Sequence, residues 1–429
     1  MKRTIATIGT ALVAAALTAT VSASPAAAGD DAFYQPPSQL PSANGAIVRT
    51  APQRLSVTFA LQAIKGTGTR LMYKSTDAAG NPVAVTGTYI EPTAPWTGTG
   101  PRPLVAFASG TQGQGDRCAP SRTLSRAIDV RPGELATGYE IPQIAGLVRA
   151  GFGVVVTDYV GLGTPDRVHT YIVRKDLGHA LLDAARAARN LEGTTLTSRS
   201  PIGLYGYSQG GGASGAAAEL APTYAPELNL KGAYVGAPPA DPLEVLRGVD
   251  GTALTGAVAY AINGLAEYSP AVRTLVATRT NAAGKAALDV VRDQCVVDTA
   301  LTFPFTRTRS WTTTGTSAAD VVAADPVVRA VVDEQRLGRV RPAVPVMVLT
   351  GTQDDVVDHR QAKQLARDWC RLGAAVDYVP IVQLVDSGGT LLNHLTPAVV
   401  DAPRARGWLR DRLMDRAVRS NCSLVPILP

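Results

Sequence analysis

Charged residues are scarce in this 429-residue sequence: Asp, Glu, Lys and Arg together make up 18% of it. With a hydrophobic content of 45%, this scarcity argues against intrinsic disorder and for a sizeable buried core. A dense basic run is also missing, because the net charge of +6 comes from arginines scattered along the chain. We therefore interpret the positive excess as part of a solvated surface, and we expect no nucleic-acid partner.

Long apolar runs are absent after the N-terminal segment, so we expect no membrane-spanning helix in the rest of the chain. The segment itself begins with Lys2 and Arg3 and continues as an alanine-rich apolar stretch over residues 5–21. Residues 26–28 are all alanine and match an A-x-A cleavage site, and Ala23 offers an earlier one. The pattern predicts a signal peptide over residues 1–28, cleavage near Ala28 and a secreted protein.

Cysteine is limited to four residues, and none of them belongs to a C-x-x-C motif, so we expect no zinc site. An even number of cysteines in an exported protein predicts two disulfides, for which three pairings are possible. The four residues are Cys118, Cys295, Cys370 and Cys422.

Most of the remaining chain alternates between short apolar runs and helical patterns. Residues 30–56 are rich in Pro, Ser and Ala, so we expect them to lack regular structure. Residues 71–76 and 83–90 flank a turn sequence and predict a β-hairpin. Continuous apolar strands alternating with helices then predict a mostly parallel sheet with helices on both faces. The expected strands cover residues 104–108, 153–158, 202–205, 230–235, 344–350 and 375–381.

Residues 241–340 interrupt this alternation with helical patterns at 254–265, 271–278 and 320–337, the last restarting at Pro326. We expect a helical insertion that covers the carboxyl ends of the strands as a cap, since ligands bind at that edge of such sheets. The alternative is a helical subdomain away from the site. The expected organisation is an α/β core over residues 29–240, the cap over 241–340, and the second part of the core over 341–429.

The sequence Gly206-Tyr207-Ser208-Gln209-Gly210 follows an expected strand and precedes an alanine-rich helical pattern. A G-x-S-x-G in this strand–turn–helix context predicts a nucleophile elbow, on which a serine hydroxyl stands clear of the sheet. The turn is so tight that a side chain two positions on either side would clash, which explains the two glycines. An ordinary glycine-rich turn is the alternative interpretation of the bare motif.

A serine nucleophile needs a histidine base, and the base needs an orienting carboxylate. The chain order serine, acid, histidine of this class of fold excludes His169 and His179, for which we expect a surface or packing role. Of the two later histidines, His394 follows the last expected strand and is favoured over His359.

The carboxylate is expected just past the end of the strand at 344–350. Asp354 is favoured there over Asp355 and Asp358, although each of the three could instead cap the next helix.

The oxyanion formed by such a nucleophile needs two backbone N–H donors. One is expected from Gln209, the residue after the serine. The other is expected from the glycine-rich loop at residues 109–115, directly after the strand at 104–108. No G-K-[ST] follows this loop, so we do not interpret it as a phosphate-binding loop.

With these residues in place, the chain resembles the secretory lipase family from about residue 33 to residue 422. The matching stretches are Cys118-Ala119-Pro120-Ser121, Gly206-Tyr207-Ser208, Tyr224-Ala225-Pro226-Glu227-Leu228-Asn229, Gln353-Asp354-Asp355-Val356-Val357 and His394-Leu395-Thr396. The resemblance implies an α/β-hydrolase fold with a helical cap, and ester substrates, especially acylglycerols.

Carried over residue by residue, the resemblance implies Ser208 as nucleophile, Asp354 as acid and His394 as base. It places the second oxyanion donor at Gln112, with Thr111 as the neighbouring alternative. It also implies the disulfides Cys118–Cys295 and Cys370–Cys422.

Two features depart from the yeast lipase that typifies the family. Gln112 stands where that lipase has an Asp, so this position carries no charge here. The chain also stops seven residues after Cys422, whereas the yeast chain continues into a flap over its active site. The second departure favours a more open, esterase-like site.

The sequence thus favours a secreted, monomeric ester hydrolase, a lipase or carboxylesterase that touches lipid interfaces transiently and needs no metal or organic cofactor. The alternatives are a serine peptidase or acyltransferase with the same triad, and a non-catalytic binding protein on the same fold.

Overall fold

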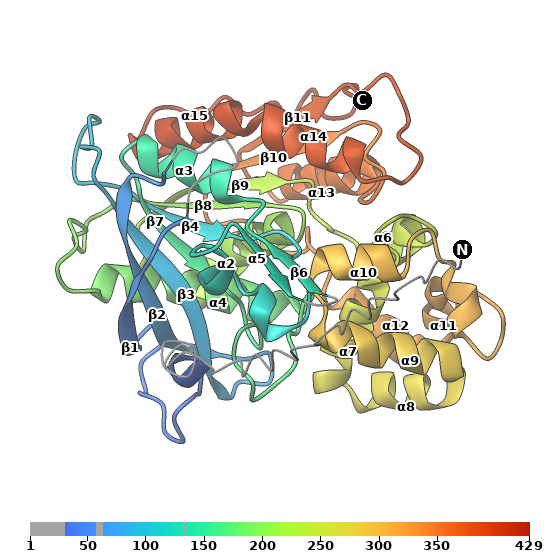
Figure 1. Ribbon diagram of the computed structural model, residues 1–429. Helices are drawn as coiled ribbons and strands as arrows, with labels where there is room; N and C mark the ends of the chain where they lie inside the picture. Colours follow the sequence, from blue (N-terminus) through green and yellow to red (C-terminus); the bar gives the residue numbers. More distant parts are fainter. Residues whose placement is uncertain (1–30, 57–62, 132–133) are drawn as a thin grey trace, which may run out of the picture. The chain divides into compact units, whose positions relative to one another are not determined.

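The computed structural model describes residues 31–56, 63–131 and 134–429 (Figure 1). The predicted signal peptide lies outside the described residues. Residues 34–429 form one unit, to which the following description applies. In the part of the chain that is described, no helix combines the length and the hydropathy needed to cross a bilayer.

A nine-stranded sheet runs through this unit in the order β1-β2-β3-β7-β4-β8-β9-β10-β11. Six of these strands are mutually parallel, namely β7, β4, β8, β9, β10 and β11. An antiparallel extension at one edge consists of β1, β2 and β3. The predicted hairpin and the predicted mostly parallel sheet are therefore confirmed. The strands are β1 (Ile47–Gln53), β2 (Gly66–Thr76), β3 (Pro82–Pro92), β4 (Leu104–Ala108), β7 (Gly153–Thr157), β8 (Ile202–Tyr207), β9 (Leu230–Gly236), β10 (Val346–Gly351) and β11 (Val376–Ile381).

The prediction of an irregular segment over residues 30–56 is wrong for β1. This strand pairs with β2 at the outer edge of the sheet, with Pro52 opposite Thr69. A proline is tolerated there because an edge strand leaves one side of its backbone without a ladder partner. The prolines on which the prediction was based, Pro36, Pro37 and Pro41, all precede the strand.

Helices cover both faces of the sheet, as predicted. On one face α4 (Arg174–Asn190), α5 (Gln209–Tyr224) and α13 (His359–Arg371) pack against the central strands, and Trp369 of α13 is fully buried there. On the other face α3 (Ile141–Arg149) and α15 (Ala402–Leu413) do so, with Leu409 of α15 fully buried. The central strands β4, β7, β8 and β10 are buried along their whole lengths, which explains why they are continuously apolar.

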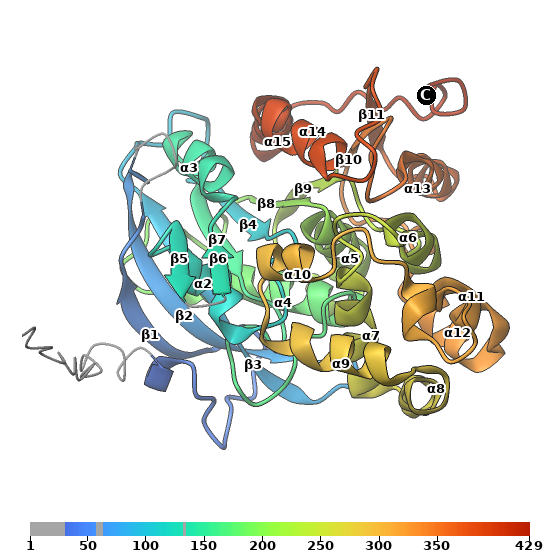
Figure 2. The same ribbon diagram turned by 45° about the vertical axis from the view of Figure 1, so that its right-hand side comes forward.

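Seven α-helices lie between β9 and β10, and they surround an apolar core that includes Tyr260, Leu288, Trp311 and Val328. Figure 2 shows them, in yellow and orange, gathered beside α5. They are α6 (Pro242–Val249), α7 (Ala257–Tyr268), α8 (Pro270–Arg279), α9 (Ala282–Val290), α10 (Val296–Thr302), α11 (Ala318–Ala324) and α12 (Pro326–Asp333).

The predicted restart at Pro326 is confirmed: Asp325 caps α12 by accepting hydrogen bonds from Val327 N and Val328 N. The helices α6, α9 and α10 were not predicted. The start of α6 carries the same signal, an aspartate cap at Asp241 followed by Pro242. Within the described residues, no strand of the sheet comes from this segment, in agreement with the prediction.

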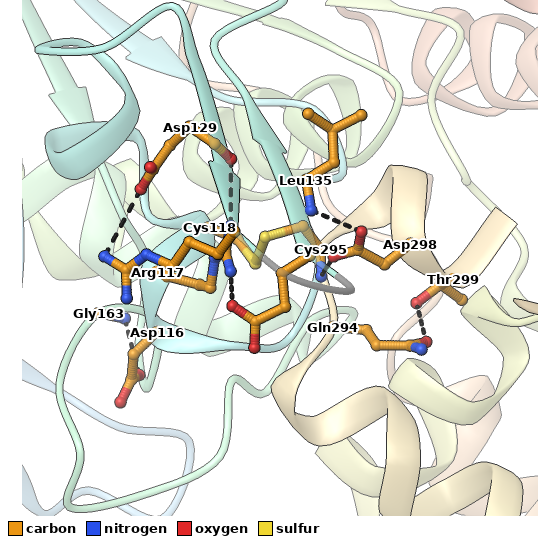
Figure 3. Close-up of a disulfide and its surroundings, with 12 residues drawn as sticks. Asp116, Arg117, Cys118, Asp129, Leu135, Gly163, Gln294, Cys295, Asp298 and Thr299 are labelled. Atoms are coloured by element: carbon orange, nitrogen blue, oxygen red, sulfur yellow. Dashed lines mark hydrogen bonds and ion pairs between the residues drawn. A yellow bond between two sulfur atoms is a disulfide. The ribbon is translucent and has the colours of Figure 1, made fainter. Parts of the chain in front are cut away.

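The connection from β4 to β7 holds the turn η1 (Asp116–Cys118), the short helix α2 (Pro120–Thr123) and a small hairpin of β5 (Ile128–Arg131) and β6 (Glu134–Thr137). The structure contains both disulfides implied by the family resemblance. Cys118 of η1 is bonded to Cys295, the residue that precedes α10, as Figure 3 shows. Cys370, near the end of α13, is bonded to Cys422 in the C-terminal tail.

Hydrogen bonds reinforce the first of these crosslinks (Figure 3). Asp298 of α10 accepts hydrogen bonds from Leu135 N of the hairpin at 2.7 Å and from Cys295 N at 3.1 Å. Gln294 O accepts a further bond from Gln114 N at 3.0 Å. The start of α10 is therefore tied to the β4–β7 connection by covalent and polar contacts together.

Removing either disulfide by a double Cys→Ala substitution is expected to lower the free energy of unfolding by about 2–5 kcal/mol, because each closes a long loop. Loss of Cys118–Cys295 should also raise amide hydrogen exchange in residues 112–118 and at the start of α10. Loss of Cys370–Cys422 serves as the control and should leave exchange there unchanged. Equal exchange in the two variants would contradict a local role for the first disulfide.

Candidate active site

The predicted elbow forms where β8 meets α5. Ser208 stands between Tyr207, the last residue of β8, and Gln209, the first of α5, with φ 58° and ψ −124°. A positive φ is strained for a serine and persists only where the surroundings hold it. Here Ser208 N donates to Gly236 O of β9 at 2.9 Å, and Gly212 N donates to Ser208 O at 3.0 Å.

The two motif glycines are required by close backbone packing. A Cβ on Gly206 would lie 2.0 Å from the carbonyl oxygen of Gly210. A Cβ on Gly210 would lie 2.0 Å from the carbonyl oxygen of Ala108, at the end of β4. Any side chain at either position would therefore push the turn away from the sheet, as the sequence motif predicted.

Ser208, His394 and Asp354 lie in one hydrogen-bonded row. His394 Nε2 is 2.9 Å from Ser208 Oγ, and His394 Nδ1 is 2.8 Å from Asp354 Oδ2. His394 lies in the first turn of α14 (Leu392–Val400), and Asp354 lies in the turn after β10. The structure thus brings together the three residues that the sequence favoured, from segments that are far apart in the chain.

The other residues considered as acid or base make different contacts. Asp358 caps α13 by accepting a hydrogen bond from Arg360 N at 2.9 Å, and His359 is the first residue of that helix. His169 and His179 are both buried, so of the two predicted roles only packing fits them. His179 stacks on Tyr224 with ring centroids 3.7 Å apart.

Asp355 has a positioning role that sequence reasoning missed. Its carboxylate accepts hydrogen bonds from His394 N at 3.0 Å, Leu391 N at 2.8 Å and Ser387 Oγ at 2.6 Å. It therefore holds the loop that carries His394. The paired aspartates at the end of β10 were a visible signal, but only the fold shows that the second one binds the loop.

The environment of His394 favours its charged form. Burial lowers its pKa, but the Asp354 carboxylate, through its charge and its hydrogen bond, and the charge of Asp355 together outweigh burial, so the pKa is raised above the usual value of 6.5. On the main-chain side, Tyr207 OH donates to His394 O at 2.6 Å. His394 is thus held by hydrogen bonds at both its imidazole ring and its backbone.

Of the residues predicted to supply oxyanion donors, Gln209 directly follows Ser208, and Gln112 lies in the loop after β4. Gln209 begins α5, and its side chain is held by His169 Nε2 at 3.0 Å and by Tyr171 O at 3.2 Å. The side chain of Gln112 turns toward Glu140, so the only group that Gln112 could direct at a reacting atom is its backbone N–H. Thr111, the alternative, lines the same cavity as Ser208 and Gln209.

A cavity lies beside Ser208, and its empty space of about 800 Å³ includes a part that is open to solvent. Its lining includes Thr111, Ser208, Gln209 and Val356, each of which follows the carboxyl end of a central strand. Much of the remaining lining is apolar and comes from α6 and α7, with the residues Val245, Leu246, Val249, Ala257, Val258 and Ala261. The cavity can therefore hold a largely apolar ligand with one polar end at Ser208.

Replacement of Gly210 by Ala is expected to lower the free energy of unfolding by more than about 2 kcal/mol, because the new Cβ overlaps the backbone of β4. Gly407→Ala is the matched control: Gly407 is exposed in α15, and a Cβ there has no neighbour within 4 Å. The control should be neutral or stabilising by up to about 1 kcal/mol. Chemical denaturation of both variants measures the difference, and equal stabilities would contradict the packing described.

Comparison with known proteins places the chain among lipases and related proteins. Candida antarctica lipase A superposes with a TM-score of 0.77 at 22% sequence identity, over 92% of this chain and 88% of that one. A likeness at this identity shows the fold alone, which is the α/β-hydrolase fold that the sequence predicted.

In sequence, the chain is 29% identical over 401 residues to a Mycobacterium tuberculosis protein named "probable inactive lipase", covering 91% of this chain and 84% of that protein. It is 28% identical to Lipase 5 of Candida albicans, covering 91% and 82%. The model of the family described as secretory lipase matches residues 128–421, which is more than half of the chain. The chain therefore belongs to the secretory lipase family.

Proposed function

We propose that this protein is a secreted serine hydrolase of carboxylic esters, a lipase or carboxylesterase that acts on acylglycerols or other esters. The observation that carries the proposal is the row of Ser208, His394 and Asp354, with contacts of 2.9 and 2.8 Å, on a strained strand–turn–helix elbow. Family membership and the lipase names of relatives support the same class of reaction.

In the proposed first half-reaction, Ser208 Oγ attacks the ester carbonyl while His394 Nε2 takes the hydroxyl proton. Asp354 stabilises the imidazolium that forms. The tetrahedral intermediate then collapses, and His394 gives the proton to the departing alcohol, which leaves Ser208 acylated. In the second half-reaction, water attacks the acyl-enzyme with His394 as base, the carboxylic acid departs and Ser208 regains its proton.

The negative oxygen of each tetrahedral intermediate is proposed to accept hydrogen bonds from Gln209 N–H and from a backbone N–H of the loop after β4. Gln209 is the first residue of α5, so the positive end of that helix dipole adds to the stabilisation. In the loop, Gln112 is the donor implied by the family and Thr111 is the neighbouring alternative.

The apolar cavity beside Ser208 supports an acyl chain as the ligand. Because α6 and α7 supply much of its wall, we interpret residues 241–340 as a cap over the site. An extracellular location is supported by the family and by the two disulfides, and a signal peptide over residues 1–28 remains the predicted export signal.

One observation favours a second candidate, a non-catalytic binding protein: a relative is named "probable inactive lipase". The alignment of Ser208, His394 and Asp354 supports activity in this chain instead. A fluorophosphonate probe separates the two, because covalent labelling of Ser208 requires an activated nucleophile. Activity on p-nitrophenyl esters without cleavage of peptide amides would likewise separate an esterase from a serine peptidase.

Ser208→Ala is expected to lower the kcat of ester hydrolysis by about 10³-fold or more, since members of a triad act as a unit. The melting temperature should change little, because only a partly exposed hydroxyl is removed. Hydrolysis of p-nitrophenyl butyrate and thermal unfolding measure the two effects. Turnover close to that of the unchanged enzyme would refute the assignment of the nucleophile.

The pH dependence of kcat/KM should show an acidic limb with its midpoint above 6.5. The reaction needs neutral His394, and because its pKa is raised, activity is lost as the pH falls through that value. Asp354→Asn should lower kcat strongly and move the limb to lower pH, because burial then acts without the paired charge. Asp355→Asn should have a milder effect on both quantities. The reverse order of the two variants would assign the acid to Asp355.

A further inference from the structure

Glu140 is a buried carboxyl group beside the active site that the mechanism above does not use. It stands at the N-terminus of α3, yet its side chain makes no capping hydrogen bond to that helix. Its oxygens instead accept hydrogen bonds from Gly110 N at 3.0 Å and from Gln112 Nε2 at 3.0 Å. The carboxyl group is therefore committed to the loop after β4, 28 to 30 residues away in sequence.

Two tyrosine hydroxyls hold the carbonyl groups of the same loop. Tyr159 OH donates to Ser109 O at 2.6 Å, and Tyr139 OH donates to Thr111 O at 2.9 Å. The peptide between Ser109 and Gly110 is thus held at its oxygen by Tyr159 and at its N–H by Glu140. This peptide cannot rotate without breaking one of the two contacts.

The same anchoring sets the direction of the Gln112 amide. In a trans peptide the C=O and N–H groups point in opposite directions. Because Thr111 O is turned toward Tyr139, the N–H of Gln112 must point away from it. Glu140 also accepts a hydrogen bond from the Gln112 side chain, so Gln112 is held at its side chain as well as at the peptide that precedes it.

The anchored loop also touches the elbow. A Cβ on Gly110 would lie 3.4 Å from Tyr207 O, directly before the nucleophile, and one on Gly210 would lie 3.0 Å from Ser109 O. A shift of the loop would therefore change the distance between Ser208 and any donor that the loop supplies. Misplacement by about 1 Å is enough to lower a rate about 100-fold.

We propose that Glu140 is a positioning residue for the oxyanion hole: its carboxyl group fixes residues 109–112 so that a backbone amide of this loop faces the carbonyl oxygen of the bound ester. The inference rests on the proposed ester hydrolysis and adds to it a residue outside the triad. Its effect is exerted through the loop, without contact between Glu140 and the substrate.

The charge state of Glu140 also predicts that activity depends on pH. Burial raises its pKa to about 8, despite the opposing hydrogen bonds from Gly110, Ser109 and Gln112. The titratable groups that interact with it electrostatically are the buried hydroxyls of Tyr139, Tyr159 and Tyr205, whose own pKa values are all raised. Arg406 of α15 interacts with Tyr205. Glu140 is therefore mainly uncharged at neutral pH, and its ionisation at higher pH places a negative charge against the loop, where it opposes the proposed oxyanion.

The test compares Glu140→Ala and Glu140→Gln with Asp176→Ala. Asp176 is a matched control, because it is also a buried carboxyl that accepts a backbone N–H, from Ala78 at 2.6 Å, and side-chain donors, Tyr268 OH at 2.8 Å and Thr170. It belongs to no part of the proposed catalytic machinery. The measurements are kcat and KM for p-nitrophenyl butyrate from pH 6 to pH 9.5, together with melting temperatures.

Glu140→Ala is expected to lower kcat about 10- to 100-fold with KM changed less than about threefold, because an oxyanion donor acts in the transition state. Glu140→Gln should restore kcat at pH 7, since an amide can accept from Gly110 N while Gln112 rotates its own amide to match. It should also remove a decline in kcat near pH 8 that the unchanged enzyme shows. Asp176→Ala should lower the melting temperature but leave kcat within about threefold.

The inference is overturned if Glu140→Ala and Asp176→Ala change kcat equally, or if Glu140→Gln keeps the decline near pH 8. Either result would leave Glu140 with a structural role only. Failure of the proposed function itself is a separate outcome, because then the unchanged enzyme would neither hydrolyse the ester nor label at Ser208.

Discussion

The close approach of the β8–α5 turn to the backbone of β4 is the constraint on which the site depends. Gly210 lies against the carbonyl oxygen of Ala108, where a Cβ would be only 2.0 Å away. This contact places the end of β4, and the loop that follows it, directly beside Ser208. The strain of the positive φ at Ser208 is tolerated because Ser208 N donates a hydrogen bond to β9 and Ser208 O accepts one from α5, which holds both sides of the turn. One packing contact therefore brings together the proposed nucleophile and its candidate oxyanion donors.

The helical segment between β9 and β10 is joined to the same loop. Val296 N donates to Gln112 O at 2.8 Å, and Gln114 N donates to Gln294 O at 3.0 Å. A buried contact joins α7 to the loop as well: Asn263 donates to the Gln114 side chain at 2.9 Å. Together with Cys118–Cys295, these contacts make the start of α10 part of the framework of the site. If the segment acts as the proposed cap, a rigid-body opening would have to break all of these contacts, so an opening would have to arise elsewhere in the segment.

Sequence patterns predicted the features that depend on which elements follow one another along the chain. Ser208 could be proposed because strand, turn and helix are consecutive, and His394 and Asp354 because chain order and strand ends restrict where a base and an acid can lie. The edge strand β1 was missed because its own residues are half-exposed and follow several prolines. Glu140, Asp355 and His169 act through contacts made by folding, with partners 28 to 40 residues away, so no local pattern distinguishes them. The helices of the insertion were predicted least well, because their short apolar stripes pack on one another instead of on the sheet.

Glu140 and His169, the buried ionisable groups beside the loop after β4 and the elbow, are both mainly uncharged near neutral pH. Burial lowers the pKa of His169 to about 4, and burial raises that of Glu140 to about 8, so both are uncharged between these values. His169 accepts from the Gln209 side chain through Nε2, while its Nδ1 lies 3.0 Å from Val160 O and donates to it. The residues that hold the side chains of Gln112 and Gln209, the two candidate oxyanion residues, therefore add dipoles without adding charge. In a site of low polarity such fixed dipoles stabilise a developing oxyanion strongly, whereas a nearby carboxylate would oppose it. In the proposed reaction the charge changes at His394, beside the carboxylates Asp354 and Asp355, whereas Glu140 and His169 stay mainly neutral.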